Sequence, residues 1–250
     1  MGLAHRIIPT ILVRGRQAFK GVGFNSWRPI GLALEKVRVH AMRGVDEVVL
    51  LDIGATAEGR GPDLALVEEL SEMLFTPLAV GGGVRSVEDM KALLRAGADK
   101  VIIGSACCEV PDIVYQCADI AGSQAIVVSV DVGYGNTAMI HCGRTGYSHD
   151  PVYCAKWAER AGAGEILLQS IDRDGTMRGY DLDLIRAVTQ DVGIPVIASG
   201  GAGTYEHMRE AIEAGASAVA AGAMFQFGDF TPAGAARYLM ENGIEARIQV

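Results

Sequence analysis

A long internal repeat constrains the fold of this chain more than any other feature. Residues 77–106 align without gaps on residues 195–224, and about a third of the positions are identical. An offset of nearly half the chain is far too long for a solenoid repeat, so it indicates two half-domains of similar structure. The coinciding positions include Gly82, Gly83, Gly104 and Glu47 in the first copy and Gly200, Gly201, Gly222 and Glu165 in the second.

Each copy shows the same alternation of short apolar runs with amphipathic segments of helix length. Such runs are typical of parallel strands, which are buried on both faces. The expected strands begin near Arg6, Asp46, Pro77, Lys100, Ala125, Gly164, Pro195 and Ala218. Helices are expected within residues 61–74, 86–97, 181–192 and 204–215, with Ser86 and Thr204 as N-caps and Gly97 and Gly215 as stops. Four strand–helix units in each copy predict a single α/β domain over residues 1–250, a (βα)8 TIM barrel built from two similar half-barrels.

Composition and charge argue against several classes of protein. The net charge of −8 is not expected of a protein with a nucleic acid or an anionic membrane as its general partner. No apolar run approaches the roughly 18 residues of a membrane span, and the first residues do not resemble a signal peptide. The five cysteines are an odd number without a C-x-x-C pair, which predicts neither a disulfide framework nor a zinc site. We expect reduced thiols, no metal, no cofactor and a cytoplasmic location.

Glycine-rich strand ends predict phosphate binding. In each half a strand ends in a glycine run before a capped helix, first at residues 81–83 and then at 200–203. Glycine lets the backbone approach an anion closely, and helix N-termini offer unpaired N–H groups. Each half closes with a second small-residue strand end, Gly104-Ser105 or Gly222-Ala223, and adjacent loops of a barrel often share one phosphate site. The alternative is that the glycines serve only tight turns and close packing. Two symmetry-related runs favour a long substrate with a phosphate at each end.

Distinctive motifs are spread along almost the whole chain. They are Arg6-Ile-Ile-Pro9, Leu51-Asp52-Ile53, Gly81-Gly82-Gly83, Asp99-Lys100, Gly122-Ser123-Gln124, Ala163-Gly-Glu165, Asp172-Arg-Asp174-Gly175-Thr176 and Ile197-Ala-Ser-Gly-Gly-Ala-Gly203. From Arg6 to about Arg247 the chain resembles the HisF family, the cyclase subunits of imidazole glycerol phosphate synthase in histidine biosynthesis. A related sugar-isomerase barrel of the same pathway shares the fold and the half-repeat, but it lacks the run from Asp172 to Thr176.

The resemblance implies a partner and a substrate. Members of the family take ammonia from a HisH-like glutaminase that docks at the N-terminal face of the barrel. They use it at the other face on a bisphosphorylated ribulosyl aminoimidazole carboxamide. By resemblance, the substrate-binding residues are Lys20, Asp52, Gly82, Gly83, Gly104, Ser105, Ser170, Asp174, Gly175, Thr176, Gly200, Gly201, Gly222 and Ala223.

Matching charges at strand starts imply an ammonia gate. The family has a ring of charges at the bottom of its barrel, and Arg6, Glu47, Lys100 and Glu165 match it. Two cations and two carboxylates can neutralise each other where lone buried charges would be costly. The ring could also be purely structural. Asp99 and Gln124 match partner-facing positions of the family, which favours a working glutaminase interface.

The catalytic face departs from the family at one important position. The family uses an acid/base pair of aspartates, near the end of strand one and at the end of strand five. Asp131 matches the second, but Leu12 stands where the first is expected. A leucine cannot transfer a proton, and general acid–base catalysis contributes about 100- to 10,000-fold per positioned group.

Three readings of the function follow. The first is a synthase subunit that receives ammonia and uses or relays it on a non-standard acceptor, as in amidation of a surface sugar. The second is an ordinary cyclase of histidine biosynthesis with a relocated base. The third is a catalytically silent scaffold that activates a glutaminase. Leu12 favours the first reading.

Overall fold

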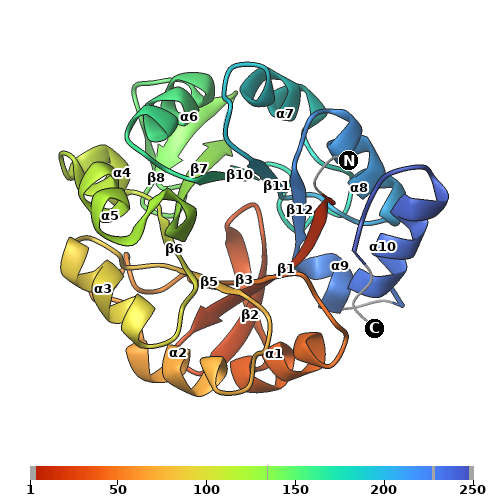
Figure 1. The fold of residues 1–250 in the computed structure, drawn as a ribbon, viewed down its shortest axis with the longest axis horizontal. Helices are drawn as coiled ribbons and strands as arrows, with labels where there is room; N and C mark the ends of the chain where they lie inside the picture. The colour runs from red at the N-terminus through yellow and green to blue at the C-terminus, as the bar shows by residue number, and fades with distance from the viewer. Residues whose placement is uncertain (1–3, 134, 227–228, 248–250) are drawn as a thin grey trace.

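Within the residues that the computed structural model describes, 4–133, 135–226 and 229–247, eight parallel strands close into a barrel (Figure 1). Each strand pairs with the strand of the neighbouring strand–helix unit, and β12 pairs with β1 to complete the ring. This confirms the predicted fold class. In their order around the barrel, the strands are β1 (Arg6–Arg14), β4 (Val48–Asp52), β5 (Leu78–Gly81), β6 (Lys100–Ile103), β7 (Ile126–Gly133), β10 (Glu165–Ser170), β11 (Val196–Ser199) and β12 (Ala218–Ala221).

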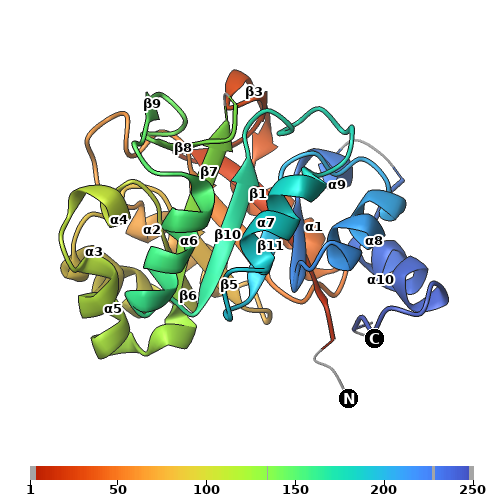
Figure 2. The ribbon, with the colours of Figure 1, turned by 90° about the horizontal axis from the view of Figure 1, so that it is seen from above.

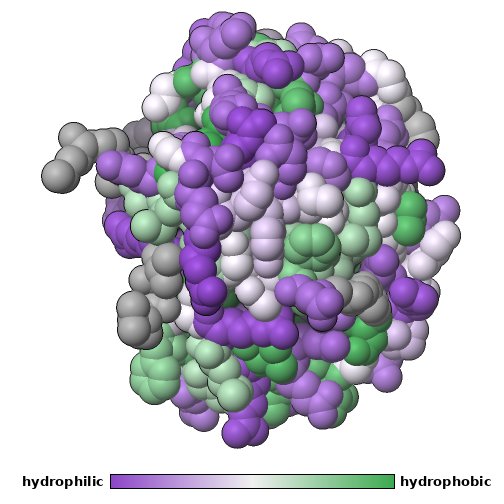
Figure 3. All heavy atoms as spheres, turned by 90° about the vertical axis from the view of Figure 1, so that its right-hand side faces the viewer, coloured by the Kyte–Doolittle hydropathy of each residue, from purple (hydrophilic) through white to green (hydrophobic). Residues whose placement is uncertain are grey.

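Helices surround the barrel (Figure 1). They are α1 (Ala33–Ala41), α2 (Leu64–Ser71), α3 (Val87–Arg95), α4 (Ala106–Glu109), α5 (Ile113–Ala121), α6 (Pro151–Arg160), α7 (Leu182–Thr189), α8 (Tyr205–Glu213), α9 (Ala223–Gln226) and α10 (Pro232–Glu241), with a 3-10 turn η1 (Ser123–Ala125). Figure 3 shows the side formed by α8 and α10, where hydrophilic side chains surround small separate hydrophobic patches. No helix in the described part of the chain is long and apolar enough to cross a membrane.

The repeat predicted from the sequence is visible in matching helix ends. The hydroxyls of Ser86 and Thr204 cap α3 and α8 by accepting the N–H groups of Asp89 and His207. Gly97 and Gly215 follow these helices with φ angles of 102° and 112°. A residue with a side chain rarely adopts such angles, so glycine ends both helices.

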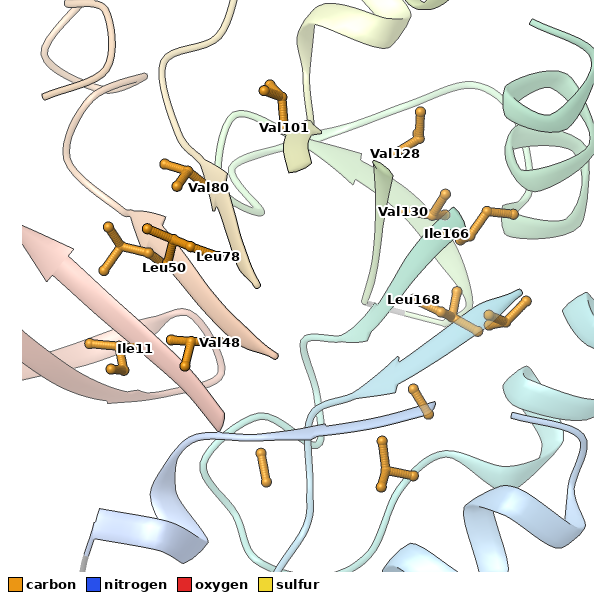
Figure 4. Close-up of a cluster of buried hydrophobic side chains, with 14 of the residues drawn as sticks. Ile11, Val48, Leu50, Leu78, Val80, Val101, Val128, Val130, Ile166 and Leu168 are labelled. Atoms are coloured by element: carbon orange, nitrogen blue, oxygen red, sulfur yellow. The ribbon is translucent and has the colours of Figure 1, made fainter. Parts of the chain in front are cut away.

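Two hydrophobic layers hold the barrel together. The first lies outside it, where side chains such as Leu50, Val80 and Val128 point from the strands toward the helices (Figure 4). The second fills the barrel and receives at least one side chain from every strand. Its buried members are Ile8, Val49, Ala79, Ile102, Val127, Leu167, Ile197, Ala218 and Ala220.

Two hairpins at the C-terminal face were not predicted. β2 (Gln17–Val22) and β3 (Asn25–Leu32) extend from β1, and β8 (Thr137–Ile140) and β9 (Thr145–Gly146) extend from β7. Both lie at the upper end of the molecule in Figure 2. Strand β3 has no buried residue, so it lacks the apolar run that reveals a barrel strand in a sequence.

Candidate functional site

A cavity of about 330 Å³ opens at the C-terminal ends of the barrel strands, beneath the β2–β3 hairpin. Active sites of this fold lie at this face, because the loops that follow the strands converge there. The cavity brings together most of the residues that the sequence analysis assigned to substrate binding and catalysis. They are Lys20, Asp52, Gly82, Gly83, Gly104, Ser105, Asp131, Asp174, Gly175, Gly200, Gly201, Gly222 and Ala223.

Ser170 and Thr176 do not line this cavity. Ser170 is buried at the end of β10, where its carbonyl group lies against the backbone of Gly200. The hydroxyl of Thr176 donates to the carbonyl of Arg173 at 2.7 Å. The Thr176 hydroxyl therefore bonds within the loop after β10, and neither residue is placed to contact a ligand in the cavity.

Asp131 is the carboxylate that β7 presents to the cavity. Strand alternation directs Asp131 and Ser129 inward, while Val130 points outward to the helix layer. Burial raises the pKa of Asp131 to about 6, although the hydroxyl of Ser129 donates to its Oδ1 at 2.8 Å and opposes that rise. A carboxyl group with this pKa changes protonation near neutral pH, which suits a general acid or base.

Asp174 adds a second carboxyl group to the same cavity. Burial, reinforced by repulsion from Asp131, raises its pKa to about 6, while the backbone N–H of Phe24 and the side chain of Gln169 lower it. Its Oδ2 atom is buried without a hydrogen-bond partner. The charge of Asp131 therefore adds to burial in keeping Asp174 protonated to higher pH.

Asp52 also lines the cavity, but its carboxylate is fully engaged. Oδ1 accepts the N–H groups of Gly54 and Ala55 at 2.9 and 3.1 Å and that of Arg60 Nη2 at 3.0 Å. Oδ2 accepts Arg60 Nη1 at 2.7 Å. Asp52 therefore fixes the loop after β4, and these bonds leave its carboxylate poorly placed to accept a proton from a ligand.

The glycine runs are required by the protein itself. Gly82 and Gly200 have φ angles of 104° and 92°, and a side chain on either would collide with the carbonyl group of Asp52 or Ser170, the last residue of the neighbouring strand. At these two positions the backbone conformation and the close packing therefore require glycine, whether or not a phosphate binds there. Gly104 differs, because a Cβ atom placed there would meet no other atom within 4 Å and would project into open space.

No carboxylate occupies the place of the expected strand-one aspartate. Leu12 lies in the last part of β1, paired with Leu51 of β4 on one side and with Phe19 of β2 on the other. Its side chain lines the cavity. Leu12, which stands where the family resemblance places an aspartate, therefore lies within the candidate site.

The four charged residues predicted as a gate form a closed ring at the opposite end of the barrel. Arg6 contacts Glu47 at 2.6 Å and Glu165 at 3.0 Å. Lys100 contacts the same two carboxylates at 2.8 and 3.1 Å. Glu47 is only 2% exposed, and both cations pair with its carboxylate. Cations and anions alternate around the ring.

The predicted partner-facing residues lie on the surface beside this ring. Asp99 directly precedes β6 and accepts the N–H of Leu78 at 2.8 Å, and Gln124 lies in η1 before β7. Both are exposed. The helix-to-strand connections of the same face also expose Met42, which is 79% exposed, and Phe75, which is fully exposed.

Several residues that line the cavity were not predicted from the sequence. Phe19, Phe24 and Trp27 come from the β2–β3 hairpin, and His141 and Cys142 follow β8. The Gly-Phe pair at positions 23 and 24, between two strand-length runs, was the available signal for the first hairpin. Nothing local in the sequence indicated that His141 and Cys142 both adopt left-handed conformations, with φ angles of 55° and 56°.

Comparisons with known proteins agree with this architecture. Residues 6–231 match the family model described as histidine biosynthesis protein. The chain is 45% identical over 240 residues to imidazole glycerol phosphate synthase subunit HisF of Thermobifida fusca (strain YX), covering 92% of this chain and 94% of that protein. It is 41% identical over 249 residues to the protein of the same name from Thermococcus gammatolerans (strain DSM 15229 / JCM 11827 / EJ3), covering 98% and 99%.

Proposed function

Because the chain belongs to the HisF family of histidine biosynthesis proteins, we propose that it is the ammonia-using synthase subunit of a glutamine amidotransferase of the imidazole glycerol phosphate synthase type. Ammonia released by a HisH-like glutaminase crosses the barrel and reacts with a phosphorylated substrate in the cavity. One observation carries this proposal: the charged ring, the apolar interior and the cavity with Asp131 follow one another along the barrel axis.

The apolar layer suits the passage of neutral ammonia. An ammonium ion would lose its hydration among Ile8, Val49 and Leu167, whereas the neutral molecule pays far less to enter. The charged ring lies where ammonia would enter, and its paired side chains would have to part briefly to admit it. The ring thereby links binding of the glutaminase to opening of the barrel.

The substrate would be held by backbone groups at the strand ends. The loops at Gly82-Gly83 and Gly200-Gly201 lie in corresponding halves of the barrel, and each has a capped helix directly after it. Such loops present N–H groups to phosphate, which explains how a chain of net charge −8 could bind a bisphosphate. Lys20, from the hairpin above the cavity, would add a positive charge.

Asp131 is the proposed acid/base group for the reaction. Its raised pKa lets it accept a proton from the attacking nitrogen and return it later in the reaction at near-neutral pH. Asp174, in the same cavity, supplies a second carboxyl group of similar pKa.

Two acceptors of the ammonia are considered: the substrate of imidazole glycerol phosphate synthase and a different phosphorylated molecule. The names of the two relatives favour the imidazole glycerol phosphate synthase reaction, with the acid/base function divided differently from the family pattern. Leu12 favours a different acceptor, because a side chain without a titratable group lies in the cavity where the resemblance places the first aspartate.

The proposed glutaminase partner would dock at the face that carries the charged ring. Phe75 and Met42 expose apolar side chains there, and the charged and polar side chains of Asp99 and Gln124 lie on the same face. Apolar anchors surrounded by polar groups are typical of protein interfaces.

A reconstitution experiment tests the proposal. The chain is co-expressed with the HisH-like glutaminase of the same organism, and the mixture is separated by size-exclusion chromatography. A one-to-one complex that consumes glutamine and aminates a phosphorylated acceptor is expected. Separate elution at micromolar concentration, together with no use of ammonium salts by the isolated chain, would contradict the assignment.

A further inference from the structure

A second cavity of about 220 Å³ adjoins the first, outside the barrel wall. It lies between strands β7 and β8 and helices α4 and α6, a region at the upper left of Figure 1. Both cavities are lined by Gly104, Ser105, Glu109 and Asp131. The loop that follows β6 therefore faces both spaces, so a single ligand could contact both.

The walls of this second cavity are aromatic and apolar. Tyr147, Tyr153 and Trp157 supply rings, while Val128 and Val130 of β7 close the side next to the barrel. The ring of His149 stacks on Tyr153 at 4.1 Å and meets Tyr147 edge-on at 5.2 Å between centroids. The two tyrosines are thus held in place before any ligand arrives.

The boundary between the cavities is built from specific polar contacts. Glu109 Oε1 lies 2.8 Å from Nε2 of His141, and the backbone N–H of His141 donates to Ser105 Oγ at 2.7 Å. His141 and Cys142 both have the left-handed conformation that non-glycine residues rarely adopt. Strain of this kind persists where surrounding contacts enforce it, and it is concentrated at binding and active sites.

The volume limits what can occupy the space. A cavity of about 150 Å³ in another protein holds benzene, so this one accommodates a somewhat larger single ring. The aromatic walls favour a flat ring, and the Glu109 carboxylate at the boundary would accept an N–H group from it.

We propose that this second cavity binds a pyrimidine-sized heterocyclic ring of a ligand whose phosphate lies at the Gly104-Ser105 loop. The ligand class is a nucleotide or nucleotide-linked acceptor. The inference rests on the proposed function for the phosphate site, and it assigns a second recognition element next to it.

Binding of uridine 5′-monophosphate and of ribose 5-phosphate, measured by isothermal titration calorimetry, tests this inference. The wild-type chain should bind the nucleotide about tenfold more tightly, because stacking on aromatic side chains adds affinity that the sugar phosphate lacks. Tyr153→Ala should remove most of this preference and leave ribose 5-phosphate binding unchanged. Tyr115→Ala is the matched control, since Tyr115 is an exposed tyrosine that lines neither cavity.

Ala138→Phe provides an independent variant, because Ala138 lines the second cavity and a larger side chain would fill it. It too should abolish the preference for the nucleotide. Equal affinity of the wild-type chain for both ligands, or a preference for the nucleotide that both variants retain, would overturn the proposed ring-binding site but not the phosphate site. Failure of both ligands to bind would overturn the phosphate site as well, which distinguishes the two outcomes.

Discussion

Leu12 and Asp131 lie on opposite strands of the barrel, with three strands between them on either side, and both side chains face the same cavity. A substrate held between them meets a titratable group on one side and a hydrocarbon on the other. This arrangement sets the main expectation for catalysis.

Leu12→Asp should restore a missing acid/base group. If the different-acceptor candidate is right, the wild-type chain should convert ammonium and the histidine-pathway substrate at least about 100-fold more slowly than a normal cyclase, and this variant should recover part of the loss. The assay follows the loss of substrate absorbance without glutaminase. Leu12→Asn is the matched control, since an asparagine side chain has the same shape as that of aspartate but does not titrate. Wild-type turnover at a normal rate would support the imidazole glycerol phosphate synthase reaction instead.

Asp131→Asn should reduce activity about 100-fold or more and also change the dependence of stability on pH. The folded-state pKa of about 6 lies above the usual 3.8, so the native state binds more protons between these values. Wild-type stability therefore falls as pH rises through this window. Above pH 6 the variant should be more stable by about 3 kcal/mol, and this gain should disappear below about pH 4. Urea unfolding at several pH values measures the gain. Asp183→Asn, at an exposed site, should show no such gain.

Gly104→Val should weaken phosphate binding without unfolding the protein. The added Cβ atom meets no neighbouring atom within 4 Å, so stability should change by less than about 0.5 kcal/mol. Gly82→Ala should instead destabilise the fold, because its Cβ atom collides with the backbone of Asp52. Calorimetric titration with inorganic phosphate and thermal unfolding distinguish the two effects. Unchanged phosphate affinity in Gly104→Val would count against a phosphate at this loop.

Lys100→Met should break the charged ring. The buried Glu47 and the neighbouring Glu165 would each lose a cation, which should cost about 3 kcal/mol of unfolding free energy. Lys156→Met removes an exposed pair with Asp191 and should cost less than about 1 kcal/mol. In a complex with glutaminase, Lys100→Met should also lower glutamine-driven turnover more than ammonium-driven turnover. Equal effects on both would indicate that the ring is structural.

Phe75→Asp should weaken the complex with the glutaminase. A fully exposed aromatic side chain at the proposed interface would be replaced by a charge, and loss of such an anchor should reduce affinity by about 30-fold or more. Val22→Asp is the control, because Val22 is an exposed apolar residue on the hairpin at the other face. Surface plasmon resonance with immobilised glutaminase measures both. Similar affinities for the two variants would place the interface elsewhere.

The sequence by itself determined the barrel, its two similar halves, the helix caps and the glycine runs at the cavity. These features depend on local signals that recur at a fixed offset, such as the apolar strands and the hydroxyls of Ser86 and Thr204. Most other cavity residues were assigned through the resemblance to a known family. The charged ring was also accessible from the sequence, through its resemblance to a known family. Its closure into four ion pairs became visible only when strands far apart in the chain were brought together.

Only the tertiary structure decided which polar groups remain available for chemistry. Asp52 and Asp174 are both aspartates near strand ends. The carboxylate of Asp52 is paired with Arg60, whereas Oδ2 of Asp174 is buried without a hydrogen-bond partner. The same is true of the glycines, since the backbone of Asp52 at the end of β4 leaves no room for a side chain at Gly82, whereas Gly104 faces open space. The side chain or backbone group that contacts each residue comes from another part of the chain. The pKa of a carboxyl group and the space around a glycine therefore depend on long-range packing, which local sequence patterns do not encode.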